Sequence, residues 1–213
     1  MKNITTLALI LSSVSLFSCK KNNSTPVEQV TVIKATGNIQ DDVNAFENLL
    51  GPLNTTPGAT GGHREINWDG LPDSLENKAL PDNLFNPTGE SASAVMQRGA
   101  VYSTTGSFMV SSNGFAAINS DAASQFSAFS GSKTFANTTA AFWDVKFQKA
   151  GTIQSASVQA FGLVFSDVDK DNSTSLEFFN GDKSLGKYFA PAHDATTLRG
   201  RHHSAWPFRL AHT

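Results

Sequence analysis

Residues that could carry acid–base chemistry are concentrated in one short segment, residues 63–73. Its ionisable members are His63, Arg64, Glu65, Asp69 and Asp73. Paired carboxylates serve as general acid and base when the fold brings them to a cleft, as in enzymes that hydrolyse glycans. The segment therefore supplies three candidate catalytic residues, Glu65, Asp69 and Asp73.

The same segment offers a candidate ligand surface. In an extended strand, Arg64 and Trp68 lie on the face opposite Glu65 and Asp69. Trp68 and Arg64 could then contact a sugar ring beside the acids. The alternative is structural, with Arg64 paired to an acid and Trp68 buried in the core. The spacing of these residues leaves both interpretations open.

A second segment has the spacing of a calcium loop. Asp167, Asp169 and Asp171 alternate along the chain, and a tight loop can turn such carboxylates toward a hard cation such as Ca²⁺. The segment is no EF-hand, because Asn172 and Phe178 occupy the positions of the invariant glycine and the bidentate glutamate. The alternative is a polar turn that links two strands.

Motifs of the common enzyme classes are absent from the sequence. It contains no Gly-x-Ser-x-Gly elbow, P-loop, dinucleotide fingerprint or His-Glu-x-x-His helix. The formal net charge of −2 gives no electrostatic footprint for nucleic acid. The chain is therefore expected to act without catalysis and without a nucleic-acid partner.

The N-terminus has the pattern of a bacterial lipoprotein signal. Lys2 precedes an apolar stretch over residues 7–17, and Leu16-Phe17-Ser18-Cys19 resembles a lipobox. We expect cleavage after residue 18, a lipid on Cys19 that anchors the chain to a membrane, and a polar tether over residues 19–29. Lys20, rather than an acid, follows the cysteine, which favours the outer membrane. The alternative is an ordinary secretory signal with an incidental cysteine.

One amphipathic helix is predicted over residues 39–50. Ile39, Val43, Phe46 and Leu50 form an apolar stripe at helical spacing, and Gly51 and Pro52 end it. A loop rich in Gly, Pro, Thr and Asn follows to residue 62. The apolar stripe predicts that the helix docks on a sheet.

The rest of the chain is predicted to be mainly β. Short β-branched or aromatic runs cover residues 64–68, 100–103, 107–111, 141–147, 155–165, 175–179 and 185–189. Asn180-Gly181 is a hairpin signal, with a loop that looks longer than two residues. Sixteen Phe suit a core between two sheets. We expect a jelly-roll-like β-sandwich domain over residues 30–197.

The tail, residues 198–213, differs from the chain before it. It has no Lys but holds three of the five His and three of the five Arg. Such a shift is typical of translation in another reading frame. The tail also lacks alternation and offers no obvious closing strand, so the fold is expected to be incomplete at the C-terminus. The alternative is a genuine basic tail.

Three segments resemble a family of uncharacterised secreted or anchored bacterial proteins. They are Gly61-Gly62-His63-Arg64-Glu65-Ile66-Asn67-Trp68-Asp69-Gly70-Leu71-Pro72-Asp73, the run over residues 98–103, and Phe161-Gly162-Leu163-Val164-Phe165-Ser166-Asp167-Val168-Asp169. The resemblance covers residues 39–191. It implies a β-sandwich and no established activity, and family members continue with further strands beyond the position of Pro191.

Together these patterns predict a lipid-anchored cell-envelope protein. Its domain is expected to be a binding or surface-structural module for a glycan or a protein, with a calcium loop. Two alternatives stay open at this point. One is an envelope glycan-active hydrolase that uses Glu65, Asp69 or Asp73, and the other is a truncated product without function.

Overall fold

The computed structural model describes residues 30–121, 123–125 and 128–193 and the backbone of residues 203–209. The expected signal, the lipidated Cys19 and the tether lie outside these residues. Strands predominate over helices in the described chain, and they pair in small antiparallel sheets. The expectation of a mainly β protein is confirmed.

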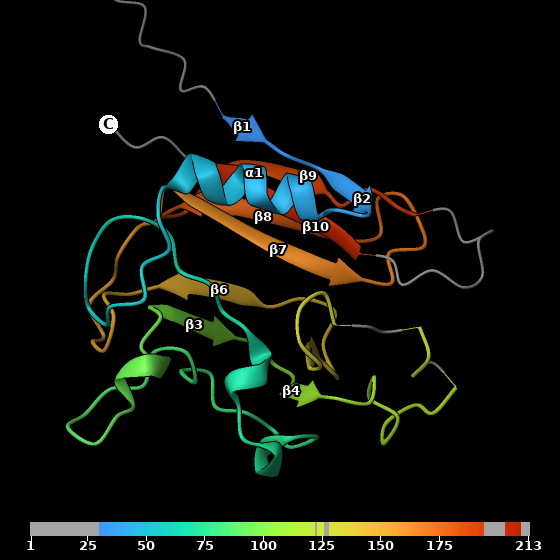
Figure 1. Ribbon diagram of the computed structural model, residues 1–213, viewed down its shortest axis with the longest axis horizontal. Helices are drawn as coiled ribbons and strands as arrows, with labels where there is room; N and C mark the ends of the chain where they lie inside the picture. The colour runs from blue at the N-terminus through green and yellow to red at the C-terminus, as the bar shows by residue number, and fades with distance from the viewer. Residues whose placement is uncertain (1–29, 122, 126–127, 194–202, 210–213) are drawn as a thin grey trace, which may run out of the picture.

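The largest sheet joins the start of the chain to its end. It consists of β1 (Thr31–Val32), β2 (Ala35–Gly37), β7 (Ala160–Ser166) and β10 (His203–Arg209). β10 pairs antiparallel with each of the other three strands. It therefore holds the N-terminal strands and β7 in one sheet (Figure 1).

β10 lies in the tail that was expected to supply no closing strand, and that expectation is wrong. Its backbone pairs with β7 from His203 opposite Ser166 to Arg209 opposite Ala160. Pairing of main-chain groups does not require alternating side chains, which is why the sequence pattern missed it. The reading-frame hypothesis is a separate matter and stays a prediction.

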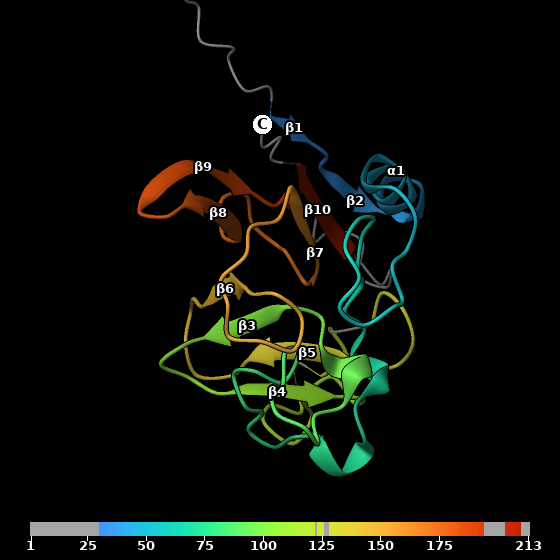
Figure 2. The same ribbon diagram turned by 90° about the vertical axis from the view of Figure 1, so that its left-hand side faces the viewer.

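The predicted helix is present as α1 (Gln40–Leu50). It lies along the sheet and contacts β10 (Figures 1 and 2). Ile39 precedes its first turn and is buried, Asp41 and Asp42 lie in that turn, and Gly51 ends it at a φ of 87°. In the part of the chain that the structure describes, no helix is long and apolar enough to cross a membrane.

The other strands form three antiparallel pairs. They are β3 (Ala100–Ser103) with β6 (Asp144–Phe147), β4 (Phe108–Ser111) with β5 (Thr134–Asn137), and β8 (Ser175–Asn180) with β9 (Lys183–Phe189). Figure 2 shows the first two pairs on one side of the molecule and the hairpin of β8 and β9 beside the sheet of β7 and β10. The β8–β9 loop has two residues, Gly181 and Asp182, so the longer loop expected there is wrong.

The segment expected to be a strand at residues 64–68 is not one. The chain makes an isolated bridge between Leu53 and His63 and then forms η1 (Trp68–Gly70), the first of three short 3-10 helices among the described residues. The others are η2 (Asp73–Leu75) and η3 (Ala94–Met96). Asn67 favours the turn over a strand because its side chain accepts a hydrogen bond from the amide of Asp69, 2.8 Å away.

An aromatic core lies among the β3–β6 pair, the β4–β5 pair and the 3-10 segments. Its buried members are Leu71, Leu80, Phe85, Ala100, Tyr102, Phe108 and Val110. Trp68 packs against this cluster, stacked on Phe135 at a centroid distance of 4.3 Å. A smaller cluster forms around Val168 and Ala190. The 69–73 segment is therefore attached directly to the main core.

Candidate functional site

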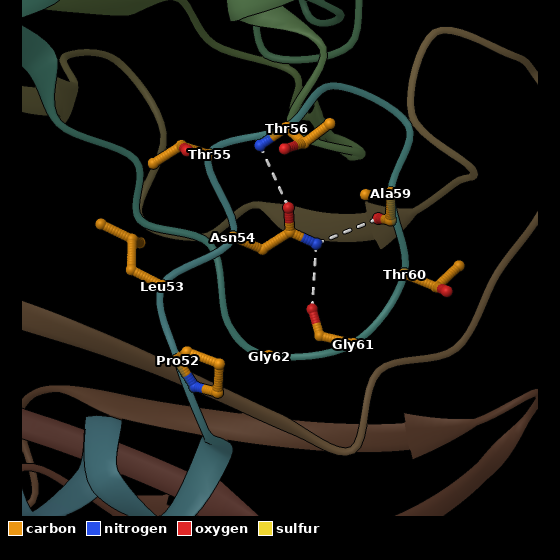
Figure 3. Close-up of a pocket in the computed structure, with 9 residues that line it drawn as sticks. All are labelled: Pro52, Leu53, Asn54, Thr55, Thr56, Ala59, Thr60, Gly61 and Gly62. Carbon is orange, nitrogen blue, oxygen red and sulfur yellow. Dashed lines mark hydrogen bonds between the residues drawn. The ribbon is translucent and has the colours of Figure 1, made fainter.

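The loop after α1 closes into a ring. The His63 amide donates to the Pro52 carbonyl at 3.1 Å, and the Asn54 amide donates to the His63 carbonyl at 2.7 Å. The ring surrounds an open hollow of about 380 Å³. Its lining residues are Pro52, Leu53, Asn54, Thr55, Thr56, Ala59, Thr60, Gly61 and Gly62 (Figure 3).

The side chain of Asn54 crosses this ring and satisfies its backbone. The amide group donates to the carbonyls of Gly61 and Ala59, at 2.9 and 3.2 Å, and its oxygen accepts from the Thr56 amide at 3.1 Å (Figure 3). Arg64 also donates to the Ala59 carbonyl. The ring loop is thus held together by its own hydrogen bonds. Arg64 binds a backbone carbonyl of this loop rather than an acid.

Three potential ligand side chains meet where the ring joins α1. The donor atoms of Glu47, His63 and Glu65 all lie within 4.8 Å of one another. His63 Nδ1 is 2.8 Å from the Gly51 carbonyl oxygen, and Nε2 is 3.3 Å from Glu65 Oε1. The His63 side chain is 10 % exposed and that of Glu65 is 52 % exposed. One end of the cluster is therefore fixed, and the other is open to water.

Glu47 was not among the residues predicted from sequence. It lies on α1 one turn after Val43, so it shares a side of the helix with a member of the apolar stripe. An acid at the edge of the apolar face of a helix can indicate a ligand that reaches a neighbouring segment, although many such acids are simply solvated. His63 and Glu65 were noted, but without a partner from the helix.

Asp69 is bound to a distant loop. Its Oδ1 accepts hydrogen bonds from the Ser132 amide at 2.6 Å, the Ser132 hydroxyl at 3.0 Å and the Lys133 amide at 3.2 Å. Burial, the largest single influence, acts to raise the pKa of Asp69. The hydrogen bonds and the Lys133 charge together outweigh it, so the pKa is lowered. Asp69 is therefore held ionised as a structural acceptor.

Asp73 is bound to the side chain of the same loop residue. The buried Lys133 ammonium donates to Asp73 Oδ1 at 2.7 Å and to the Leu71 carbonyl at 2.6 Å, and it lies 3.5 Å from Glu76 Oε1. The hydrogen bond to Asp73 is the largest influence and raises the pKa of Lys133. Sequence reasoning missed Lys133, since nothing in its neighbours marks it as buried.

The three candidate catalytic residues therefore have different partners. Glu65 faces His63, while Asp69 and Asp73 bind the loop of Lys133. None of the three lines the hollow of the ring. Trp68 and Arg64 also separate, because Trp68 packs on Phe135 and Arg64 binds the ring.

The aspartate-rich segment forms a tight turn after β7. Asp167 has a φ of 63°, and burial, followed by the charge and hydrogen bond of Asp169, raises its pKa. Asp171 accepts a hydrogen bond from the Ala192 amide at 3.4 Å. Among the described residues, the His, Cys and acid side chains that cluster within metal-binding distance are those of Glu47, His63 and Glu65. A calcium ion at Asp167, Asp169 and Asp171 stays a prediction.

Comparison of the chain with protein-family models, with curated proteins and with solved structures finds no match.

Proposed function

We propose that this chain is an exported lipoprotein whose domain acts as a binding or surface-structural module at the cell envelope, without catalysis. The lipid on Cys19 would anchor it, most simply at the outer membrane, and the domain would be a jelly-roll-like β-sandwich of the secreted family whose motifs it resembles. A glycan or an envelope protein is the proposed ligand.

The proposal that the domain acts without catalysis rests on the hydrogen bonds of the acids in residues 69–73. A general acid or base must reach the substrate, directly or through one water molecule. Asp69 Oδ1 instead accepts three hydrogen bonds from Ser132 and Lys133, and Asp73 binds the Lys133 ammonium. The contacts of Asp69 support a structural role for that residue and argue against its use as a catalytic acid or base. The Asp73 side chain is 92 % exposed, so its bond to Lys133 does not by itself argue against the hydrolase alternative.

Fractionation of cells that express the chain and its Cys19→Ser variant tests the anchor. The wild-type protein is expected in the membrane fraction with incorporated palmitate, and the variant in the soluble exported fraction without it. In this proposal the lipid on Cys19 is the anchor, so its loss should release the protein from the membrane. Equal membrane retention of both proteins would contradict the lipid anchor.

A glycan array and cross-linking in intact envelopes, both with the full chain, test the binding role. Saturable capture of one glycan class or one envelope protein is expected. Failure of both assays would count against a binding module. Hydrolysis of envelope glycans that is lost in Asp73→Asn would instead support the hydrolase.

A further inference from the structure

We propose that Glu47, His63 and Glu65 form a binding site for a divalent transition-metal ion of the zinc class. The donor atoms of the three side chains lie within 4.8 Å of one another. The site depends neither on the lipid anchor nor on the ligand proposed above.

The ring loop sets which nitrogen of His63 is free. His63 Nδ1 lies 2.8 Å from the Gly51 carbonyl oxygen, which can only accept a hydrogen bond. Nδ1 must therefore carry the hydrogen, and the neutral ring then has its lone pair on Nε2. A backbone carbonyl that orients a histidine in this way is the usual support of a metal-binding imidazole.

That lone pair points at a second acceptor. Nε2 lies 3.3 Å from Glu65 Oε1, and a neutral imidazole nitrogen and a carboxylate oxygen attract each other only through a cation between them. A proton on Nε2 is one such cation, but N–H···O hydrogen bonds usually measure about 2.7–3.2 Å. Adjacent ligands on a tetrahedral Zn²⁺, each bonded at about 2.1 Å, lie about 3.4 Å apart. The 3.3 Å separation is compatible with a direct hydrogen bond when Nε2 carries a proton, and it also leaves room for a metal ion in place of that proton.

Glu47 supplies the third ligand and the charge balance. It reaches the cluster from α1, and together with Glu65 it brings two negative charges toward a divalent cation. The exposure of Glu65 leaves the fourth position to water. An imidazole with two carboxylates suits Zn²⁺ and similar ions, whereas Ca²⁺ takes about 6–8 oxygen ligands.

The ring holds the histidine in place before any ion binds. The backbone of His63 is fixed on both sides, by its own amide to Pro52 and by the Asn54 amide to its carbonyl. Gly62, with a φ of 65°, allows this closure because a Cβ there would collide with the Pro52 carbonyl. A site on a helix and a braced loop loses little conformational entropy on binding.

Zinc titration of the full chain, purified in detergent and stripped with a chelator, tests the site. Calorimetry is expected to show one Zn²⁺ per chain, and excess Ca²⁺ should not displace it. Glu47→Gln keeps the size of the side chain but removes its charge, so we expect Zn²⁺ affinity to fall at least about 10-fold. Glu90→Gln, at an exposed acid outside the cluster, is the matched control and should bind as the wild type does.

His63→Gln should also reduce Zn²⁺ affinity, but it removes the bond to Gly51 and can loosen the ring. Glu47→Gln therefore decides the question, because none of the ring's hydrogen bonds involves Glu47. The joint His202→Gln, His203→Gln and His212→Gln variant controls for the tail histidines. The proposal is overturned if Zn²⁺ does not bind saturably, if Glu47→Gln binds like Glu90→Gln, or if only the tail variant loses binding.

Discussion

Lys133 and Asp69 show how single residues fix the polar motif to the core. Asp69 binds the amides of Ser132 and Lys133, and the Lys133 ammonium returns to Leu71 and Asp73. The contacts cross about 60 residues of sequence. Asp69, which looks catalytic in the sequence, is thus part of the framework around the aromatic core.

Replacing Asp69 should destabilise the fold. Asp69→Ala leaves the amides of Ser132 and Lys133 without their acceptor, which should cost about 1–3 kcal/mol of unfolding free energy. Asp69→Asn keeps an acceptor oxygen and should cost less. Urea unfolding measures both, with the exposed Asp82→Ala as control. If all three variants unfold alike, the network does not stabilise the fold.

The same network predicts how stability depends on pH. The folded pKa values of Asp69 and Glu76 lie below their ordinary values of 3.8 and 4.5. For Glu76 the main cause is the hydrogen bond from the Ser112 hydroxyl. Their stabilisation is complete above those ordinary values and is lost as the pH falls through the folded ones. The folded pKa of Lys133 is raised above 10.5, so its contribution is lost only as the pH rises beyond that.

Thermal unfolding from acid to alkaline pH checks this behaviour. The melting temperature is expected to fall on acidification below about pH 4. Asp69→Ala should flatten part of that decline, because the variant has already lost one of the responsible carboxylates. An unchanged acid limb in Asp69→Ala would show that Asp69 does not contribute to the acid sensitivity.

Asp167 is expected to behave in the opposite way. Burial and the charge of Asp169 raise its pKa, so its ionised form disfavours folding at neutral pH. Asp167→Asn removes the charge, and Asn tolerates the observed φ of 63° well. We expect the variant to be more stable at pH 7 by less than about 1 kcal/mol. Thermal unfolding with and without Ca²⁺ measures it.

Calcium separates the two interpretations of this turn. If Asp167, Asp169 and Asp171 bind Ca²⁺, the ion should raise the melting temperature of the wild type but not that of Asp167→Asn. If the segment is only a polar turn, Ca²⁺ should leave both melting temperatures unchanged.

At the scale of elements, the ring after α1 depends on two glycines in different ways. Gly61 and Gly62 both have positive φ, of 84° and 65°. A Cβ at Gly61 meets nothing within 4 Å, whereas one at Gly62 would collide with the Pro52 carbonyl. Gly61→Ala should cost about 1 kcal/mol for the backbone conformation alone.

Gly62→Ala should cost more than Gly61→Ala, at least about 2 kcal/mol, because it also breaks the closure at Pro52. It should weaken Zn²⁺ binding as well, since His63 is fixed through the same closure. Chemical unfolding and zinc titration of the two variants test this. Equal losses in both would mean that the ring is not held by the contact of Gly62 with Pro52.

At the scale of the whole molecule, β10 holds the first and last parts of the described chain together. β1, β2 and β7 are joined in one sheet only through it. Deleting residues 203–213 should therefore cost several kcal/mol and release the N-terminal strands to proteases. Deleting residues 210–213 alone is the control and should change little.

Limited proteolysis and thermal unfolding measure the effect of the deletion. If the longer deletion unfolds at the wild-type temperature, with β1 and β2 protected, β10 is dispensable. That result would favour the hypothesis that the tail is a foreign sequence.

The sequence by itself determined the features that depend on local patterns. Apolar spacing predicted α1 to within one residue, Gly and Pro marked the ring loop, and Asn180-Gly181 marked the β8–β9 hairpin. Short β-branched and aromatic runs indicated a mainly β fold. These features follow from backbone sterics and from alternating burial along a few residues. The local sequence determines both of these properties.

Only the tertiary structure decided the partners. Lys133 binds Asp73, and Glu47 meets His63 and Glu65. β10 pairs with β1 and β2 near the start of the chain and with β7, although no local pattern links these segments. The sequence around a carboxylate does not indicate which distant amide or ammonium will bind it. A strand can also pair through its main-chain groups, whatever its side chains are. Long-range contacts in the folded chain therefore determine which acids have a structural role and which are accessible to a ligand.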